Sequence, residues 1–161
     1  MTTFGISLGT RQTGVCIIKD EVLYIAQVHN FIDPWSRTKL TKIINRYREY
    51  IKKYNVTDIM VKVPHSSQQK GSIKELMDKV VALAKEYGCD IDFITKDELK
   101  GFTRIKKTAE LLDWTRRQYP DLNAYYERAL TKSKYYYEWS FEAVLAAHVY
   151  QKKKVLRVNK T

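Results

Sequence analysis

A run of basic and aromatic residues in the second half of the chain has the composition of a nucleic-acid-binding surface. Cations recur from residue 100 to residue 134 and are followed by three consecutive tyrosines at 135–137. Cationic side chains neutralise phosphates, and tyrosine rings can stack on unpaired bases. Alternatively, the basic helix face is simply solvated, and at least one of the tyrosines packs in the core. The candidate binding residues in this run are Arg104, Lys106, Lys107, Arg116, Arg117, Lys132 and Lys134.

The overall composition favours an anionic partner for a folded protein. The 161 residues include 29 Lys and Arg against 18 Asp and Glu, which leaves a net charge of +11. Basic side chains that neutralise phosphates release condensed counterions, so we expect a nucleic-acid partner, with DNA preferred. The hydrophobic fraction of 44% is enough for a core, and the composition excludes disorder. We expect a single domain over residues 1–152 and a basic C-terminal tail over residues 153–161.

The chain lacks the sequence features of a membrane or secreted protein. No apolar run reaches the roughly 20 residues that span a bilayer, and the first residues lead into a strand pattern rather than a signal peptide. We therefore expect a cytoplasmic protein with no membrane partner. Cys16 and Cys89 have neither a CxxC spacing nor nearby metal ligands, so we expect both to be reduced.

The first third of the chain predicts a β-meander followed by a helix. Residues 4–8, 14–19 and 21–28 are rich in β-branched and apolar residues and are separated by turn residues, which favours three antiparallel strands. Apolar residues then recur at helical spacing over residues 36–54, with Ser36 as the expected N-cap.

Strands and helices alternate in the rest of the chain. A strand over 57–63 ends at Pro64, and another is expected over 91–95. Between them, Ser72 and Glu75 have capping-box spacing and predict a helix that ends at Gly88. A further helix is expected over 103–119. The last helix is expected to begin at Ser140, and its apolar character on most faces is typical of a helix packed on a sheet.

Two segments of the chain have recognisable motifs. Residues 5–15 read Gly-Ile-Ser-Leu-Gly-Thr-Arg-Gln-Thr-Gly-Val, and residues 140–147 read Ser-Phe-Glu-Ala-Val-Leu-Ala-Ala. The first resembles the opening strand and turn, and the second the last helix, of the RuvC-type Holliday junction resolvases, which have the ribonuclease H-like fold. The resemblance implies an α/β fold with a mixed five-stranded sheet. Its first three strands would be antiparallel and the others parallel, with helices on both faces.

The acids that this family uses are mostly absent. The resemblance implies four carboxylates that hold two divalent cations for hydrolysis. Ser7 takes the place of the first-strand Asp, the fourth strand has Lys62 where the family has Glu, and Trp139 takes the earlier acidic position of the last helix. Glu142 alone matches. We therefore expect no metal or other cofactor, with Mg²⁺ or Mn²⁺ needed only if the protein is a nuclease.

Lys62 and Glu142 each allow a second interpretation. Lys62 either points into the expected metal site, where its ammonium would repel a dication, or points outward on an alternating strand. Glu142 is either a remaining ligand or a carboxylate in the first turn of a helix, where it interacts with the helix dipole. His148, within the same helix, is expected to be a partly buried structural residue.

The resemblance also implies where nucleic acid would cross the molecule. The loops 9–13 and 64–71 would frame the groove, and Arg11 and Lys70 are their basic residues. Alternatively, both are ordinary polar loops. Resolvases of this type are dimers, so a homodimer is implied, with helix 36–54 as a candidate interface.

Three functions remain open on the sequence alone. The first is a nucleic-acid-binding protein that recognises branched or structured DNA or RNA without cleaving it. The second is an active metal-dependent endonuclease that uses displaced acids such as Glu138, Glu142 or Asp20. The third is a protein-interaction scaffold, because a fold does not guarantee a function.

Overall fold

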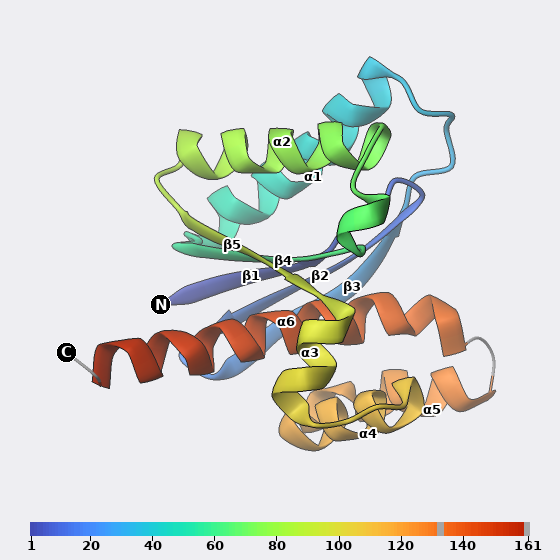
Figure 1. Cartoon of the computed structure of the whole chain (residues 1–161), viewed down its shortest axis with the longest axis vertical. Coiled ribbons are helices and arrows are strands. Elements are labelled where there is room, and N and C mark those ends of the chain that lie inside the picture. The colour runs from blue at the N-terminus through green and yellow to red at the C-terminus, as the bar shows by residue number, and fades with distance from the viewer. Residues whose placement is uncertain (132–133, 160–161) are drawn as a thin grey trace.

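The computed structural model describes residues 1–131 and 134–159, and its strands form one mixed sheet in the order β3-β2-β1-β4-β5 (Figure 1). The first three strands are an antiparallel meander, and β1, β4 and β5 run parallel. This confirms the predicted mixed sheet. The strands are β1 (Thr2–Ser7), β2 (Gln12–Lys19), β3 (Val22–Asn30), β4 (Asp58–Val63) and β5 (Asp90–Thr95).

Helices cover both faces of the sheet, as Figure 1 shows. Two helices pack on one face, and the long last helix crosses the other face against β1 and β2. In the described part of the chain, no helix is both long enough and apolar enough to cross a membrane. The helices are α1 (Arg37–Tyr54), α2 (Ser72–Glu86), α3 (Lys96–Thr103), α4 (Thr108–Gln118), α5 (Asn123–Thr131) and α6 (Lys134–Asn159), with short 3₁₀ turns at Ser66–Gln68 and Pro120–Leu122.

Alternation along β1 divides its side chains between the two layers. Phe4, Ile6 and Leu8 are buried in the core with α1 and α2. Gly5, on the opposite face, lies directly beneath α6: a Cβ there would be 2.3 Å from the Ala143 carbonyl oxygen. Glycine is therefore required for α6 to approach the sheet this closely, and this approach fixes the height of α6 above Ser7.

Helix boundaries differ from the sequence prediction in three places. Ser36 caps α1 as predicted, because its Oγ accepts from the Lys39 N–H at 3.1 Å. Ser72 is instead the first residue of α2, where no side-chain cap occurs. The capping box lies at Thr95 and Glu98, at the start of α3. The helix expected over 103–119 begins only at Thr108, as α4, and the unpredicted helix α3 precedes it and ends where Arg104 adopts the left-handed conformation (φ 61°).

The last helix is longer than predicted in both directions. It begins at Lys134, so Ser140 lies inside it and donates its hydroxyl to the Tyr137 carbonyl at 2.8 Å. Residues 153–159, expected as a separate tail, continue the helix. His148 is buried, as expected, and its Nδ1 lies 2.7 Å from the Tyr119 hydroxyl. Burial lowers the pKa of His148 to about 4, so the ring is neutral at pH 7.

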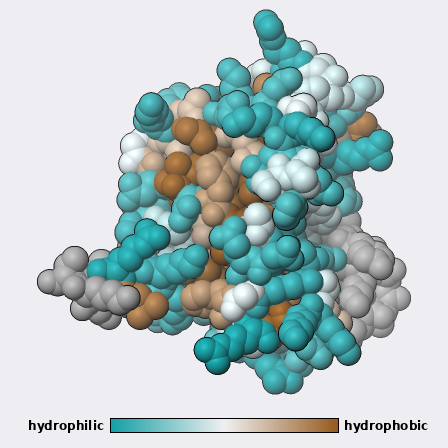
Figure 2. Space-filling view, in the orientation of Figure 1, coloured by the Kyte–Doolittle hydropathy of each residue, from teal (hydrophilic) through white to brown (hydrophobic). Residues whose placement is uncertain are grey.

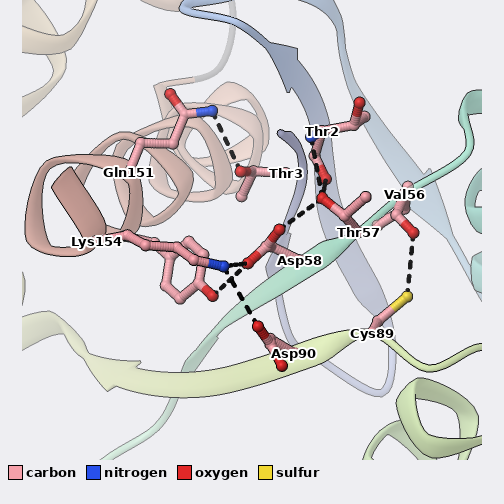
Figure 3. A network of polar contacts seen from close by, with 10 residues as sticks. Thr2, Thr3, Val56, Thr57, Asp58, Cys89, Asp90, Gln151 and Lys154 are labelled. Carbon is pink, nitrogen blue, oxygen red and sulfur yellow. Dashed lines mark hydrogen bonds and ion pairs between the residues drawn. The ribbon is translucent and has the colours of Figure 1, made fainter. Parts of the chain in front are cut away.

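A polar network anchors the C-terminal part of α6 at the amino edge of the sheet (Figure 3). Asp58, at the start of β4, accepts from the Tyr150 hydroxyl at 2.6 Å and from the Lys154 ammonium. Lys154 also lies 3.3 Å from Asp90 on the neighbouring strand. Burial opposes the charged form of Asp58, but the Lys154 and Thr57 hydrogen bonds outweigh it and lower the pKa of this carboxyl group.

We expect Lys154→Met to reduce the free energy of unfolding by about 2 kcal/mol, because Asp58 stays buried without its cation but the 35% exposure of the Lys154 side chain weakens the pair relative to a fully buried one. The wild-type contribution is present above the unfolded-state pKa of Asp58 and is lost as the pH falls through the lowered folded-state pKa. The difference in free energy of unfolding between the wild type and Lys154→Met should therefore become smaller as the pH falls. Chemical denaturation at several pH values measures this. Lys153→Met, on the same helix, is the matched control, and an equal loss in both variants would contradict the prediction.

Candidate functional site

Four charged side chains and one hydroxyl meet where the parallel strands end at their carboxyl edge. Ser7 ends β1 and is paired in register with Lys62 on β4. Lys96 directly follows β5, and α6 places Glu138 and Glu142 one helical turn apart on the facing side. Parallel strands bring their carboxyl ends to one edge of a sheet, which is why residues so distant in sequence become neighbours.

Glu142 is the centre of this group. Its Oε2 lies 2.9 Å from the Lys62 ammonium and accepts from the Ser7 hydroxyl at 3.2 Å. Its Oε1 lies 3.2 Å from the Lys96 ammonium. Only 7% of the Glu142 side chain and 15% of the Lys62 side chain are exposed. Both carboxylate oxygens of a nearly buried acid are therefore already paired with cations.

Glu138 completes the network. Its Oε1 accepts from the Lys96 ammonium at 2.6 Å. The two lysines and two glutamates then carry no net charge together. We name this group, Ser7, Lys62, Lys96, Glu138 and Glu142, the lysine–glutamate cluster.

The two glutamates differ in their protonation behaviour. Burial opposes the charged form of Glu142, but the ammonium groups of Lys62 and Lys96 outweigh burial and lower its pKa. Burial raises the pKa of Glu138, and the Lys96 hydrogen bond only partly offsets this. For Lys96, the hydrogen bond to Glu138 and the charge of Glu142 outweigh burial and raise the pKa. Glu142 is therefore the firmly ionised member of the pair.

The structure decides between the two interpretations of Lys62 and of Glu142. Lys62 points into the cluster and not outward. Glu142 lies well inside α6, which begins at Lys134, so the interpretation as a first-turn carboxylate is wrong. Trp139 lies beside the cluster, with its ring centroid 5.8 Å from the Lys62 ammonium. A Cβ at Gly9 would approach this indole to 2.7 Å, so glycine lets the loop after β1 pack on the ring.

Comparisons with known proteins place the chain by structure and not by sequence. No protein-family model matches it, and no curated protein matches it. The Thermus thermophilus RuvC structure is 14% identical, with 96% of this chain and 97% of that chain covered and a TM-score of 0.72. T. thermophilus RuvC in complex with a Holliday junction substrate is 13% identical, with 96% of each chain covered and a TM-score of 0.70. The fold is that of RuvC. The predicted ribonuclease H-like fold of the RuvC type is confirmed.

The residues at this edge of the RuvC-type fold do not fit a divalent metal. Within the described residues, no three His, Cys, Asp or Glu side chains are grouped so that they could hold an ion. Glu138 and Glu142 are held by Lys96 and Lys62, and a dication would have to displace or approach two ammonium groups. Like-charge repulsion opposes this, and the Ser7 hydroxyl is a poor substitute for a carboxylate. The cluster therefore supports no hydrolytic step through a bound metal.

The structure places two of the predicted binding residues at the same edge as the cluster. Arg11 is exposed in the loop between β1 and β2, and Lys70 is exposed in the segment between β4 and α2. Both segments leave the carboxyl ends of β1 and β4, as expected. Hydrophilic residues cover most of the molecular face in Figure 2, and hydrophobic surface is exposed mainly in a limited area between α2 and α6.

The remaining predicted binding residues do not share one surface. Arg116 lies 2.6 Å from Asp113 and over the Tyr126 ring, and Arg117 lies 2.8 Å from the same Asp113. These two guanidinium groups are therefore paired within the protein. Lys132 and the Lys134 side chain lie outside the described residues. Arg104, Lys106 and Lys107 are exposed at the end of α3 and in the link to α4.

Lys96 was not among the residues expected at this site. A usable signal was its position directly after β5, because the residue that follows a parallel strand lies at the carboxyl edge of the sheet. Glu138 was considered as a displaced acid for a nuclease, but the structure pairs it with Lys96.

Proposed function

We propose that this protein binds branched or structured nucleic acid, DNA in preference to RNA, and does not cleave it. The observation that carries the proposal is the lysine–glutamate cluster, in which Lys62 and Lys96 pair with the carboxylates that a metal would need. An internal cation on each oxygen of Glu142 leaves no charge to attract Mg²⁺ or Mn²⁺. The same pairing argues against a nuclease that uses Glu138 or Glu142.

Nucleic-acid binding is supported by charge and by the structural neighbours. The net charge of +11 favours a polyanion, and the exposed Arg11 and Lys70 lie on segments beside the cluster. One RuvC structure of the same fold was determined with a Holliday junction substrate. A neutral cluster also removes the repulsion between unpaired carboxylates and phosphates, so a backbone could cross this edge without a metal.

We expect affinity for a four-way DNA junction to fall steeply as salt rises. Each phosphate contact contributes a slope of about −0.9 in a plot of log K against log salt concentration. Arg11→Gln/Lys70→Gln should weaken binding and reduce that slope by about two. Fluorescence anisotropy with a labelled junction measures both quantities.

The matched control is Lys19→Gln/Lys52→Gln, which removes the same charge from exposed residues near the opposite edge of the sheet. A flat salt response would contradict the proposal and favour an interaction scaffold. Cleavage of the junction with Mg²⁺ or Mn²⁺ that Glu142→Gln abolishes would favour the nuclease instead.

A homodimer is part of the proposal, with α1 as the candidate interface. Sedimentation of the protein alone and with a junction gives the stoichiometry. Two copies on one four-way junction are the expected result, because two-fold symmetric dimers are the commonest homo-oligomers.

A further inference from the structure

The loop of residues 31–36 between β3 and α1 is held firmly at the carboxyl edge of the sheet. The Phe31 N–H donates to the Arg11 carbonyl at 2.7 Å, which joins this loop to the loop after β1. The nearly buried Lys39 donates its ammonium to the Asp33 carbonyl at 2.6 Å. Pro34 further restricts the backbone. The loop is therefore preorganised.

This firmly held loop presents one fully exposed apolar side chain. Phe31 and Trp35 pack against the hydrophobic core, but Ile32 between them is 94% exposed. Single exposed apolar residues are common on protein surfaces. Here hydrogen bonds fix the backbone on both sides of Ile32, so the loop holds this side chain in its exposed position.

A cleft of about 830 Å³ lies beside this side chain. It is lined by residues 10–12 of one loop, residues 30–35 of the other, and Lys39. Arg11 is exposed on one wall, and the partly buried rings of Phe31 and Trp35 form part of the other. The carboxylate of Asp33 lies 3.2 Å from the Lys42 ammonium, so the acid in the cleft already has a cation.

This lining combines what an unstacked base and its phosphate require. Aromatic side chains stack on base faces, and apolar side chains such as isoleucine can insert between bases and unstack them. The cation beside them suits a phosphate. A protein partner fits less well, because a stable protein interface buries more than about 1,000 Å² with an apolar centre, and here the apolar surface consists of Ile32 and the partly buried rings of Phe31 and Trp35.

We propose that Ile32 packs against an unpaired base at a branch point or strand opening, while Arg11 contacts the adjacent phosphate. The inference rests on the proposed nucleic-acid binding and adds to it the feature that is recognised, an exposed base face. Fully paired duplex offers no such face away from its ends. Ile32 therefore determines preference for branched or single-stranded nucleic acid over duplex.

The test compares a four-way junction, a single strand and a duplex whose two ends are closed by non-nucleotide linkers, each labelled with fluorescein. Ile32→Ser should weaken binding to the junction and the single strand by about five- to tenfold, the low end of the loss expected for an aromatic stacking residue, because an isoleucine covers less of a base than a ring does. Affinity for the duplex should change by less than twofold. Ile32→Phe should retain the preference. The control is Val22→Ser, since Val22 is also exposed (55%) but lies at the opposite end of β3.

A 2-aminopurine placed at the branch point reports the contact directly. Its fluorescence should change on binding of the wild type and much less on binding of Ile32→Ser at saturating protein. If the wild type binds the junction but Ile32→Ser alters all three affinities equally, or none, the inference is overturned and the proposed function stands. If the wild type binds none of the three DNAs, both are overturned.

Discussion

Lys62→Met should lower the free energy of unfolding by about 3 kcal/mol, the larger of the two stability effects expected from single substitutions. The substitution keeps the volume of the side chain and removes the ammonium that lies 2.9 Å from Glu142. Removing one partner of a buried ion pair leaves an uncompensated charge, which typically destabilises a protein by about 3–5 kcal/mol. Lys96 still neutralises part of that charge, so we expect the lower end of this range.

A double substitution measures the interaction between Lys62 and Glu142 itself. Lys62→Met/Glu142→Leu should be markedly more stable than Lys62→Met alone, because replacing both partners of a buried pair by apolar residues is often neutral or stabilising. Chemical denaturation of the wild type, both single variants and the double variant gives the coupling free energy. Strictly additive effects would show that Lys62 and Glu142 do not interact.

The effect of Lys62→Met should also depend on pH. The pKa of Glu142 is lowered in the folded protein from its ordinary value of 4.5. The ionised carboxylate therefore stabilises the fold above pH 4.5, and this stabilisation is lost as the pH falls through the lowered pKa. Without Lys62, burial dominates and the carboxyl group binds a proton more readily. The difference between wild type and variant should therefore narrow as the pH falls. A constant difference from pH 7 to pH 3 would contradict this account.

Placing carboxylates at residues 7 and 62 and removing the Lys96 ammonium should create a metal-dependent protein. Ser7→Asp/Lys62→Glu/Lys96→Gln would gather four acids around the end of β1, including Glu138 and Glu142. Their repulsion should destabilise the metal-free variant. A dication at one hundred times its dissociation constant then adds about 2.7 kcal/mol to the free energy of unfolding. This corresponds to an increase in Tm of roughly 5–10 °C at this chain length.

Thermal unfolding with Mn²⁺, Mg²⁺ or EDTA measures the restored site. The wild type should show no shift with either metal. Ser7→Asn/Lys62→Gln/Lys96→Gln is the matched control, because it removes the same lysines without adding acids, and it should respond as the wild type does. A large Mn²⁺ shift in the wild type would show that the lysine–glutamate cluster does not exclude metal.

Local pattern was sufficient to predict most of the elements. Alternation and turn residues predicted the meander, and helical spacing with Ser36 predicted α1. Capping was harder, because the same spacing at Ser72 and Glu75 did not form a box, whereas Thr95 and Glu98 did. The side chain of a capping residue must reach a backbone N–H, and the preceding strand or loop decides whether it does.

The amino-acid sequence alone shows a serine, a lysine and a tryptophan where the resembled family has acids, and it shows that Glu142 is retained. The folded structure is needed to show that Lys62 points inward, that Lys96 joins it, and that both neutralise the glutamates of α6. The reason is distance along the chain. The contacts of Glu142 with Ser7, Lys62 and Lys96 depend on how parallel strands and a crossing helix meet at one edge, and no local pattern encodes that meeting.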